Sequence, residues 1–168
     1  MPGYASETGK AAFAASSSRF DGLVAWLAGD QAAGMTHGEL EDRLHSEGLA
    51  LLRQLLQDSL DLRAVREQRL VEVIDADGYG RGVAEDGHER GLATRFGVVT
   101  VTRMAYRARG RSNLHPADAE LNLPVEKHSH GLRKLAAIEA GPRTRRRRTR
   151  PSTAPAVPPR GRGCPASR

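Results

Sequence analysis

The sequence predicts an α+β protein, with helices first and then a small antiparallel β-hairpin and a short helix. Three observations lead to this prediction. Apolar residues recur at helical spacing across residues 20–68. β-branched residues concentrate in the stretch VVTVT, residues 98–102, directly after a glycine that suits a turn. A last amphipathic stretch follows Ser129 and ends where a basic tail begins.

The first elements differ sharply in composition. Residues 1–18 are rich in Ala, Ser and Gly, which predicts a disordered leader. Apolar residues then recur every three or four positions from Phe20 to Leu27, as on one face of a helix. We expect this short amphipathic helix to end at Gly29 or Gly34, because glycine commonly follows a helix end.

A long helix is the best-supported element. Thr36 is followed three residues later by Glu39, the spacing of a capping box, and no proline interrupts the next thirty or so residues. The apolar stripe from about residue 37 to 66 is broad, which suits packing on a domain or in a helical dimer better than a strict two-stranded seam. We expect Leu51 and Leu55 to be its most buried leucines.

The β-hairpin is predicted over residues 92–109, with its turn around Gly97. Residues 83–91, VAEDGHERG, are polar and predict a linker. The preceding Asp75 and Asp77 lie in an Asp-x-Asp-Gly sequence, which favours a turn over a cation site.

The second strand ends in the basic cluster of the predicted fold, Arg103, Arg107, Arg109 and Arg111. These arginines either contact DNA, or are solvated at a wet strand edge, or pair with carboxylates within the domain. The candidate DNA-binding residues are Arg103, Arg107, Arg109, Arg111, Arg133, Lys134, Arg145, Arg146, Arg147 and Arg148.

The segment 112–140 is predicted as a structured loop followed by a helix capped by Ser129. Six residues with metal-ligating side-chain types lie close together in its sequence: His115, Asp118, Glu120, Glu126, His128 and His130. Their spacing matches no known zinc or iron pattern, so we interpret them as polar loop residues and expect no metal, cofactor or catalytic site.

The charge of the chain is unevenly distributed. The net charge is +6, but residues 141–168 contain nine arginines and no acidic residue, so residues 1–140 are slightly acidic. This tail predicts disorder and, at most, weak and largely non-specific DNA binding. It is either a basic arm or GC-rich DNA read out of frame; the abrupt change inside a predicted helix favours the second interpretation.

Several classes are disfavoured. The only cysteine, Cys164, lies in the tail, which excludes disulfides and a thiolate zinc site in the rest of the chain. The first twenty residues have no apolar core of a signal peptide, and the longest apolar run, LVAWLA, is too short to span a membrane. We therefore expect a cytoplasmic protein.

Two long stretches resemble a known family. They are similar to the N-terminal region of ISKra-type insertion-sequence transposases. The first stretch is MTHGELEDRLHSEGLALLRQLLQDSLDLRA, and the second, which follows it, is GHERGLATRFGVVTVTRMAYRARGRSNLHPADAELNLPVEKHSHGLRKLAAIEA. The specific part is the ordered series of a strand pair around Gly97, Arg103, Tyr106, then LNLP and HSHGLRKL. The resemblance covers about residues 20–140.

The resemblance implies a role in DNA-end recognition or assembly during transposition. In that family the ribonuclease H-like domain, whose acidic triad holds two metal ions, lies C-terminal to the region resembled. No residue here matches the triad, so we expect a truncated, non-enzymatic transposase fragment. The alternative is a small helical module that self-associates or binds full-length transposase subunits.

Overall fold

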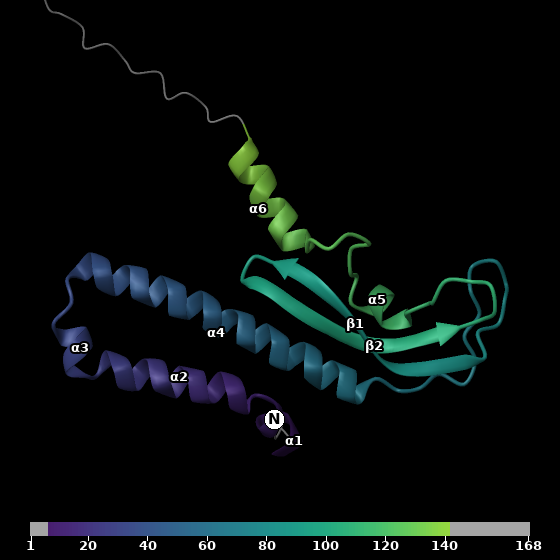
Figure 1. The fold of residues 1–168 in the computed structure, drawn as a ribbon, viewed down its shortest axis with the longest axis horizontal. Helices are drawn as coiled ribbons and strands as arrows, with labels where there is room; N and C mark the ends of the chain where they lie inside the picture. Colours follow the sequence, from purple (N-terminus) through teal and green to yellow (C-terminus); the bar gives the residue numbers. More distant parts are fainter. Residues whose placement is uncertain (1–6, 142–168) are drawn as a thin grey trace, which may run out of the picture.

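The computed structural model describes residues 7–141. Its elements in chain order are α1 (Glu7–Ala12), α2 (Ala14–Leu27), α3 (Asp30–Ala33), α4 (His37–Arg66), β1 (Val83–Thr94), β2 (Gly97–Arg107), α5 (Pro116–Glu120) and α6 (His130–Ala140). Figure 1 shows α2 lying beside α4 on one side, the hairpin on the other side, and α6 projecting from the turn end of the hairpin. The predicted α+β class is confirmed.

The long helix α4 begins where its capping box predicted. The Glu39 N–H donates to Thr36 Oγ1 at 3.4 Å, and the Thr36 N–H donates to Glu39 Oε2 at 2.8 Å. The two hydrogen bonds satisfy donors that the first helical turn leaves without an intrahelical partner.

The disordered leader predicted over residues 1–18 is wrong for residues 7–12 and 14–18, which belong to α1 and α2. A tertiary contact explains the difference. Ser16 is buried, and its N–H donates to Asp58 Oδ2 at 3.1 Å, while Gln54 donates to Asp58 Oδ1 at 2.8 Å. This polar contact fixes α2 against α4 in a segment whose composition carries few apolar residues.

The hairpin is longer than predicted. Strand β1 starts at Val83, so the linker predicted over residues 83–91 is wrong. These residues pair antiparallel with β2, and a bulge interrupts the pairing between Glu85 and His88. This strand escaped prediction because polar side chains occupy it on both faces. The predicted turn around Gly97 is confirmed, with Arg95 and Phe96 as the two turn residues.

Gly97 is favoured at the end of this turn because its φ of +121° lies in a region that residues with a Cβ rarely adopt. A Cβ there would also stand 2.9 Å from Cδ of Arg53, whose exposed side chain lies against the glycine. The turn of the hairpin therefore packs directly against the middle of α4.

The core lies between α4, one face of the hairpin and the segment after α5. It contains Leu60, Leu92, Val99 and Val101, with Leu56, Leu121 and Leu123 packed at its border. The expectation that Leu51 and Leu55 would be the most buried leucines of α4 is wrong, because Leu55 is 38% exposed whereas Leu60 is 8% exposed. The sheet covers the opposite face of α4 from these two leucines.

Helix α4 also covers the outer edge of β2. The Gln57 side-chain amide accepts from the Thr100 N–H at 2.8 Å and donates to the Thr100 carbonyl at 3.0 Å, as a neighbouring strand would. Further along the same edge, Glu67 accepts from the Met104 N–H at 2.9 Å. The edge is thereby closed to strand pairing with another chain.

Candidate nucleic-acid interface

Arg103 is not at a wet strand edge; it is a buried structural residue. Its side chain is 8% exposed, and its Nε lies 2.6 Å from Asp118 Oδ1. These two atoms lack the alignment of a directional hydrogen bond, so the attraction is mainly coulombic. Side chains two residues apart in a strand lie on the same face, so Arg103 shares the buried face of β2 with Val99 and Val101. Burial removes it from the candidate DNA contacts.

The other arginines at the strand end differ in how far they are committed. Arg107 pairs with Glu85, and this hydrogen bond, with that of His88, holds the pKa of Glu85 below its usual value. Nη1 of Arg111 lies 2.8 Å from Asp77 Oδ2. The same guanidinium stacks on Tyr79, with its Cζ 3.7 Å from the centre of the ring.

Arg109 is exposed and takes part in no ion pair among the described residues. The predicted basic cluster is thus largely neutralised by carboxylates of the domain. Arg109 alone of the four keeps a free guanidinium in the described part of the chain.

The Asp-x-Asp-Gly segment forms a turn, as predicted. Asp75 accepts from the Tyr79 N–H at 2.9 Å and from the Asp77 N–H at 3.0 Å, and Arg81 binds its other oxygen at 2.6 Å. The pKa of Asp75 is lowered, chiefly by the hydrogen bond from the Tyr79 N–H. Hydrogen bonds from the Arg81 side chain and the Asp77 N–H lower it further, and together they outweigh the desolvation that would raise it. Its carboxylate is fully occupied by protein donors.

The six residues of the loop cluster are dispersed. Asp118 binds Arg103, Glu126 lies 3.1 Å from Arg133, and the ring of His115 lies 5.7 Å from that of His88. Within residues 7–141, no three His, Cys, Asp or Glu side chains converge to hold a metal ion. Burial, and then the Arg103 guanidinium, lowers the pKa of His115, so its imidazole is neutral near pH 7.

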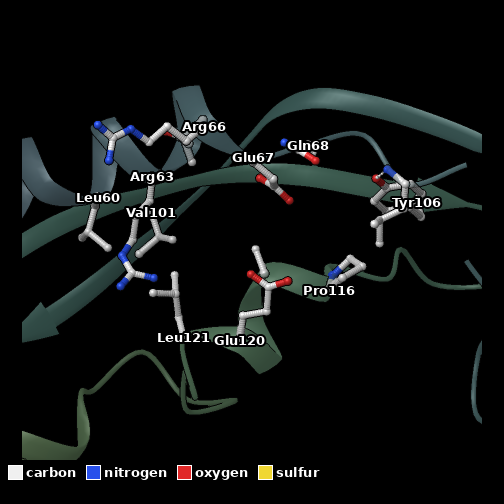
Figure 2. Close-up of a pocket in the computed structure, with 14 residues that line it drawn as sticks. Leu60, Arg63, Arg66, Glu67, Gln68, Val101, Tyr106, Pro116, Glu120 and Leu121 are labelled. Atoms are coloured by element: carbon white, nitrogen blue, oxygen red, sulfur yellow. Dashed lines mark hydrogen bonds between the residues drawn. The ribbon is translucent and has the colours of Figure 1, made fainter. Parts of the chain in front are cut away.

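A pocket of about 400 Å³ lies between the end of α4, strand β2 and α5. Figure 2 shows Glu67 and Glu120 pointing into it from opposite sides. Glu67 is already held by the Met104 N–H, and the Tyr106 hydroxyl accepts from the Leu70 N–H at 2.7 Å. The polar groups here fasten the end of α4 to the sheet and form no nucleophile–base pair.

A different basic surface lies at the turn end of the hairpin, and we call it the hairpin-tip patch. It consists of Arg53, Arg95, Lys127, Arg133 and Lys134, all of which are exposed. Among the ion pairs of the described residues, only Arg133 of these five takes part in one, with Glu126. The patch therefore holds a local excess of positive charge on a body that is slightly acidic.

Contacts between distant segments bring the patch together. The side chain of Arg53 in α4 lies against Gly97 at the hairpin turn. Arg95 in the same turn lies against α6: its Cδ is 3.8 Å from the position that a Cβ on Gly131 would take. Lys134 follows Gly131 by one helical turn, so both lie on the same face of α6.

The loop before α6 is fixed to the hairpin by its backbone. The Ala93 N–H donates to the Lys127 carbonyl at 2.7 Å, and the Ser129 N–H donates to the Ala93 carbonyl at 2.8 Å. Ser129 also caps α6, as predicted, by accepting from the Leu132 N–H at 3.1 Å. Lys127 and the first turn of α6 are thereby held beside the turn of the hairpin, as Figure 1 shows for the ribbon.

The structure places the predicted DNA-binding residues in different surroundings. Arg133 and Lys134 join the patch, whereas Arg103 is buried. Arg145, Arg146, Arg147 and Arg148 lie outside the described residues. Arg53, Arg95 and Lys127 were missed, because no local sequence signal shows that a turn, a helix centre and a distant loop meet.

The chain matches no family model, curated protein or solved structure in our comparisons. Among residues 7–141, no helix combines the length and apolar character that crossing a bilayer requires.

Proposed function

We propose that this chain binds DNA as the end-recognition or assembly region of an insertion-sequence transposase, and that the hairpin-tip patch supplies its phosphate contacts. The observation that carries the proposal is the meeting of five exposed cations from three distant chain segments, four of them outside any ion pair of the described residues. The similarity in sequence to ISKra-type transposases supports DNA as the partner.

The geometry suits a phosphate backbone. Arginine and lysine side chains that neutralise phosphates release counterions, and such contacts fix the position of a protein on a duplex. Backbone hydrogen bonds join the hairpin to the loop before α6, and the Arg53 side chain of α4 lies against Gly97, so the cations of the patch are held on rigid elements.

The tail has a separate part in this proposal. Residues 143–150 hold six arginines, which neutralise phosphates without reading bases. We assign most of the non-specific affinity to the tail and the orientation of the folded part on DNA to the patch. The proposal places the protein in the cytoplasm and gives it no strand-cleaving step of its own.

The test is a binding measurement on two duplexes. The full chain is titrated, by fluorescence anisotropy, into a labelled insertion-sequence end and into a scrambled duplex of equal length. The proposal expects tighter binding to the end, and a smaller preference for the end in an Arg95→Ala/Lys134→Ala variant. Equal binding to both duplexes by the unaltered chain would refute end recognition.

A further inference from the structure

Charge is unevenly distributed along the hairpin. The acidic residues of its two strands are Glu85, Asp86 and Glu89, all in β1 and all before Arg90. Residues 90–117, which include the turn and the whole of β2, contain no acidic residue. An anionic partner that approaches the turn end therefore meets no opposing carboxylate of the hairpin.

Cations lie beside both edges of the hairpin next to its turn. On the β2 edge, which α4 covers, the Arg53 side chain lies against Gly97. On the β1 edge, the Ala93 N–H donates to the carbonyl of Lys127, and the first turns of α6 with Lys134 follow. The turn end is thereby bordered by positive charge on two opposite sides.

An apolar side chain lies between these two lines of cations. Val98 points to the face of the hairpin opposite the core residue Val99, and it is 63% exposed. Its neighbours on that face are small: Ala93 is its partner across the sheet, and Gly91 follows diagonally. The outer face at the turn end is therefore shallow, uncharged and apolar at its centre.

A duplex groove has the complementary arrangement, because its base edges lie between two phosphate strands. The major groove is about 12 Å wide and about 8.5 Å deep and admits a two-stranded β-ribbon, whereas the minor groove is only about 6 Å wide. Strands rise about 3.4 Å per residue, so a turn that enters the major groove brings the second residue pair, Ala93 and Val98, to the base edges.

We propose that the turn end of the hairpin enters the major groove of duplex DNA, where Val98 packs against thymine methyl groups; this inference rests on the DNA binding proposed above. Arg53 then faces the phosphates of one strand, and Lys127 with Lys134 faces those of the other. Thymine presents an apolar group in the major groove, and a valine is suited to that contact. The cations position the protein, whereas Val98 contributes to the choice of sequence.

Replacing every thymine of the insertion-sequence end by deoxyuridine tests the proposal. The replacement removes methyl groups from the major groove and leaves the phosphates and the minor groove as they are. The full-length chain is used, with the six arginines of residues 143–150 replaced by Gln so that the tail does not mask the hairpin. We expect the affinity to fall about fourfold, the effect of one methyl group returned to water.

Two valine variants in the same background locate the contact. Val98→Ala should bind the thymine and deoxyuridine duplexes with nearly equal affinity, and its salt dependence should match that of the unaltered hairpin, because no charge is removed. Val83→Ala is the matched control, since Val83 is 56% exposed at the other end of the hairpin. It should distinguish the two duplexes as the unaltered hairpin does.

Two results would overturn the inference. One is equal affinity of the unaltered hairpin for the two duplexes, and the other is a loss on deoxyuridine that is as large in Val98→Ala as in the unaltered hairpin. Either result leaves a preference for the insertion-sequence end over a scrambled duplex intact, and with it the proposed function. If that preference is absent, both proposals fail.

Discussion

Arg103 and Asp118 join the centre of the hairpin to the short helix after it, with Nε of Arg103 2.6 Å from Oδ1 of Asp118. A second arginine completes the attachment: Arg90 lies 3.6 Å from the same carboxyl group and donates to the carbonyls of Pro124 and Glu126 at 2.6 and 2.7 Å. Two strand arginines thus hold residues 116–126 on the sheet. Both arginines therefore have a structural role.

Removing Arg103 should therefore destabilise the fold. Arg103→Ala leaves Asp118 partly buried without its closest cation, and we expect a loss of about 2–3 kcal/mol, below the full cost for a wholly buried pair because Asp118 is 27% exposed. Urea denaturation measures the loss. Arg107→Ala is the matched control, since its pair with Glu85 is largely exposed to solvent and should contribute little to stability. Equal losses for both variants would contradict the structural role of Arg103.

The side-chain amide of Gln57 should be a second point of sensitivity. Gln57→Ala leaves the Thr100 N–H and carbonyl without protein partners at a half-buried edge, at an expected cost of about 1–3 kcal/mol. Hydrogen exchange of the Thr100 amide should speed up in the variant. Gln68→Ala, at an exposed position, should leave both stability and exchange unchanged.

Leu60 should be the residue of α4 that contributes most to the stability of the core. Leu60→Ala should cost about 2–4 kcal/mol, because Leu60 packs with Leu92, Val99 and Val101. Leu70→Ala, at a residue that is 46% exposed, should cost clearly less. Thermal melts of the two variants decide the matter, and a larger loss for Leu70→Ala would contradict the packing described.

How far the sequence predicts this fold depends on how local each signal is. The capping box of Thr36 and Glu39, the Ser129 cap and the turn before Gly97 are decided by neighbouring residues, and these three predictions are confirmed. The start of β1 and the helix around Ser16 depend on partners far along the chain, Arg107 and Asp58 among them, and were missed.

The candidate site shows the same division. Arg133 and Lys134 were named as possible DNA-binding residues; both are exposed on α6 and lie in the patch, and their contact with DNA stays a prediction. Arg103 was predicted for its charge too, but charge alone does not reveal which face of a strand is buried. Because Arg103 points inward with Val101, the sheet pairing rather than the composition decides its role.

The neutral state of His115 predicts a loss of stability in mild acid. Burial, and then Arg103, lowers the pKa of His115 below the value near 6.5 of the unfolded chain, so the unfolded chain binds more protons between the two values. The contribution to stability is complete above about pH 6.5 and is lost as the pH falls through the lowered pKa.

Denaturation in urea at pH 7.5 and pH 5 measures this dependence. The drop in the unfolding free energy should be smaller in His115→Gln than in the unaltered chain. His130→Gln, at an exposed position, should show the same drop as the unaltered chain. An undiminished drop in His115→Gln would show that other groups cause it.

The salt dependence of DNA binding tests the central claim, that the hairpin-tip patch contacts phosphates, most directly. The six arginines of residues 143–150 are first replaced by Gln so that the tail does not mask the patch. In that background, Arg95→Ala/Lys127→Ala/Lys134→Ala should weaken binding and reduce the slope of log affinity against log salt by about 2–3, since each phosphate contact contributes about 0.9. Lys10→Ala/Arg66→Ala/Arg69→Ala removes the same charge elsewhere and should leave the slope nearly unchanged. Equal slopes for the two triple variants would contradict the account.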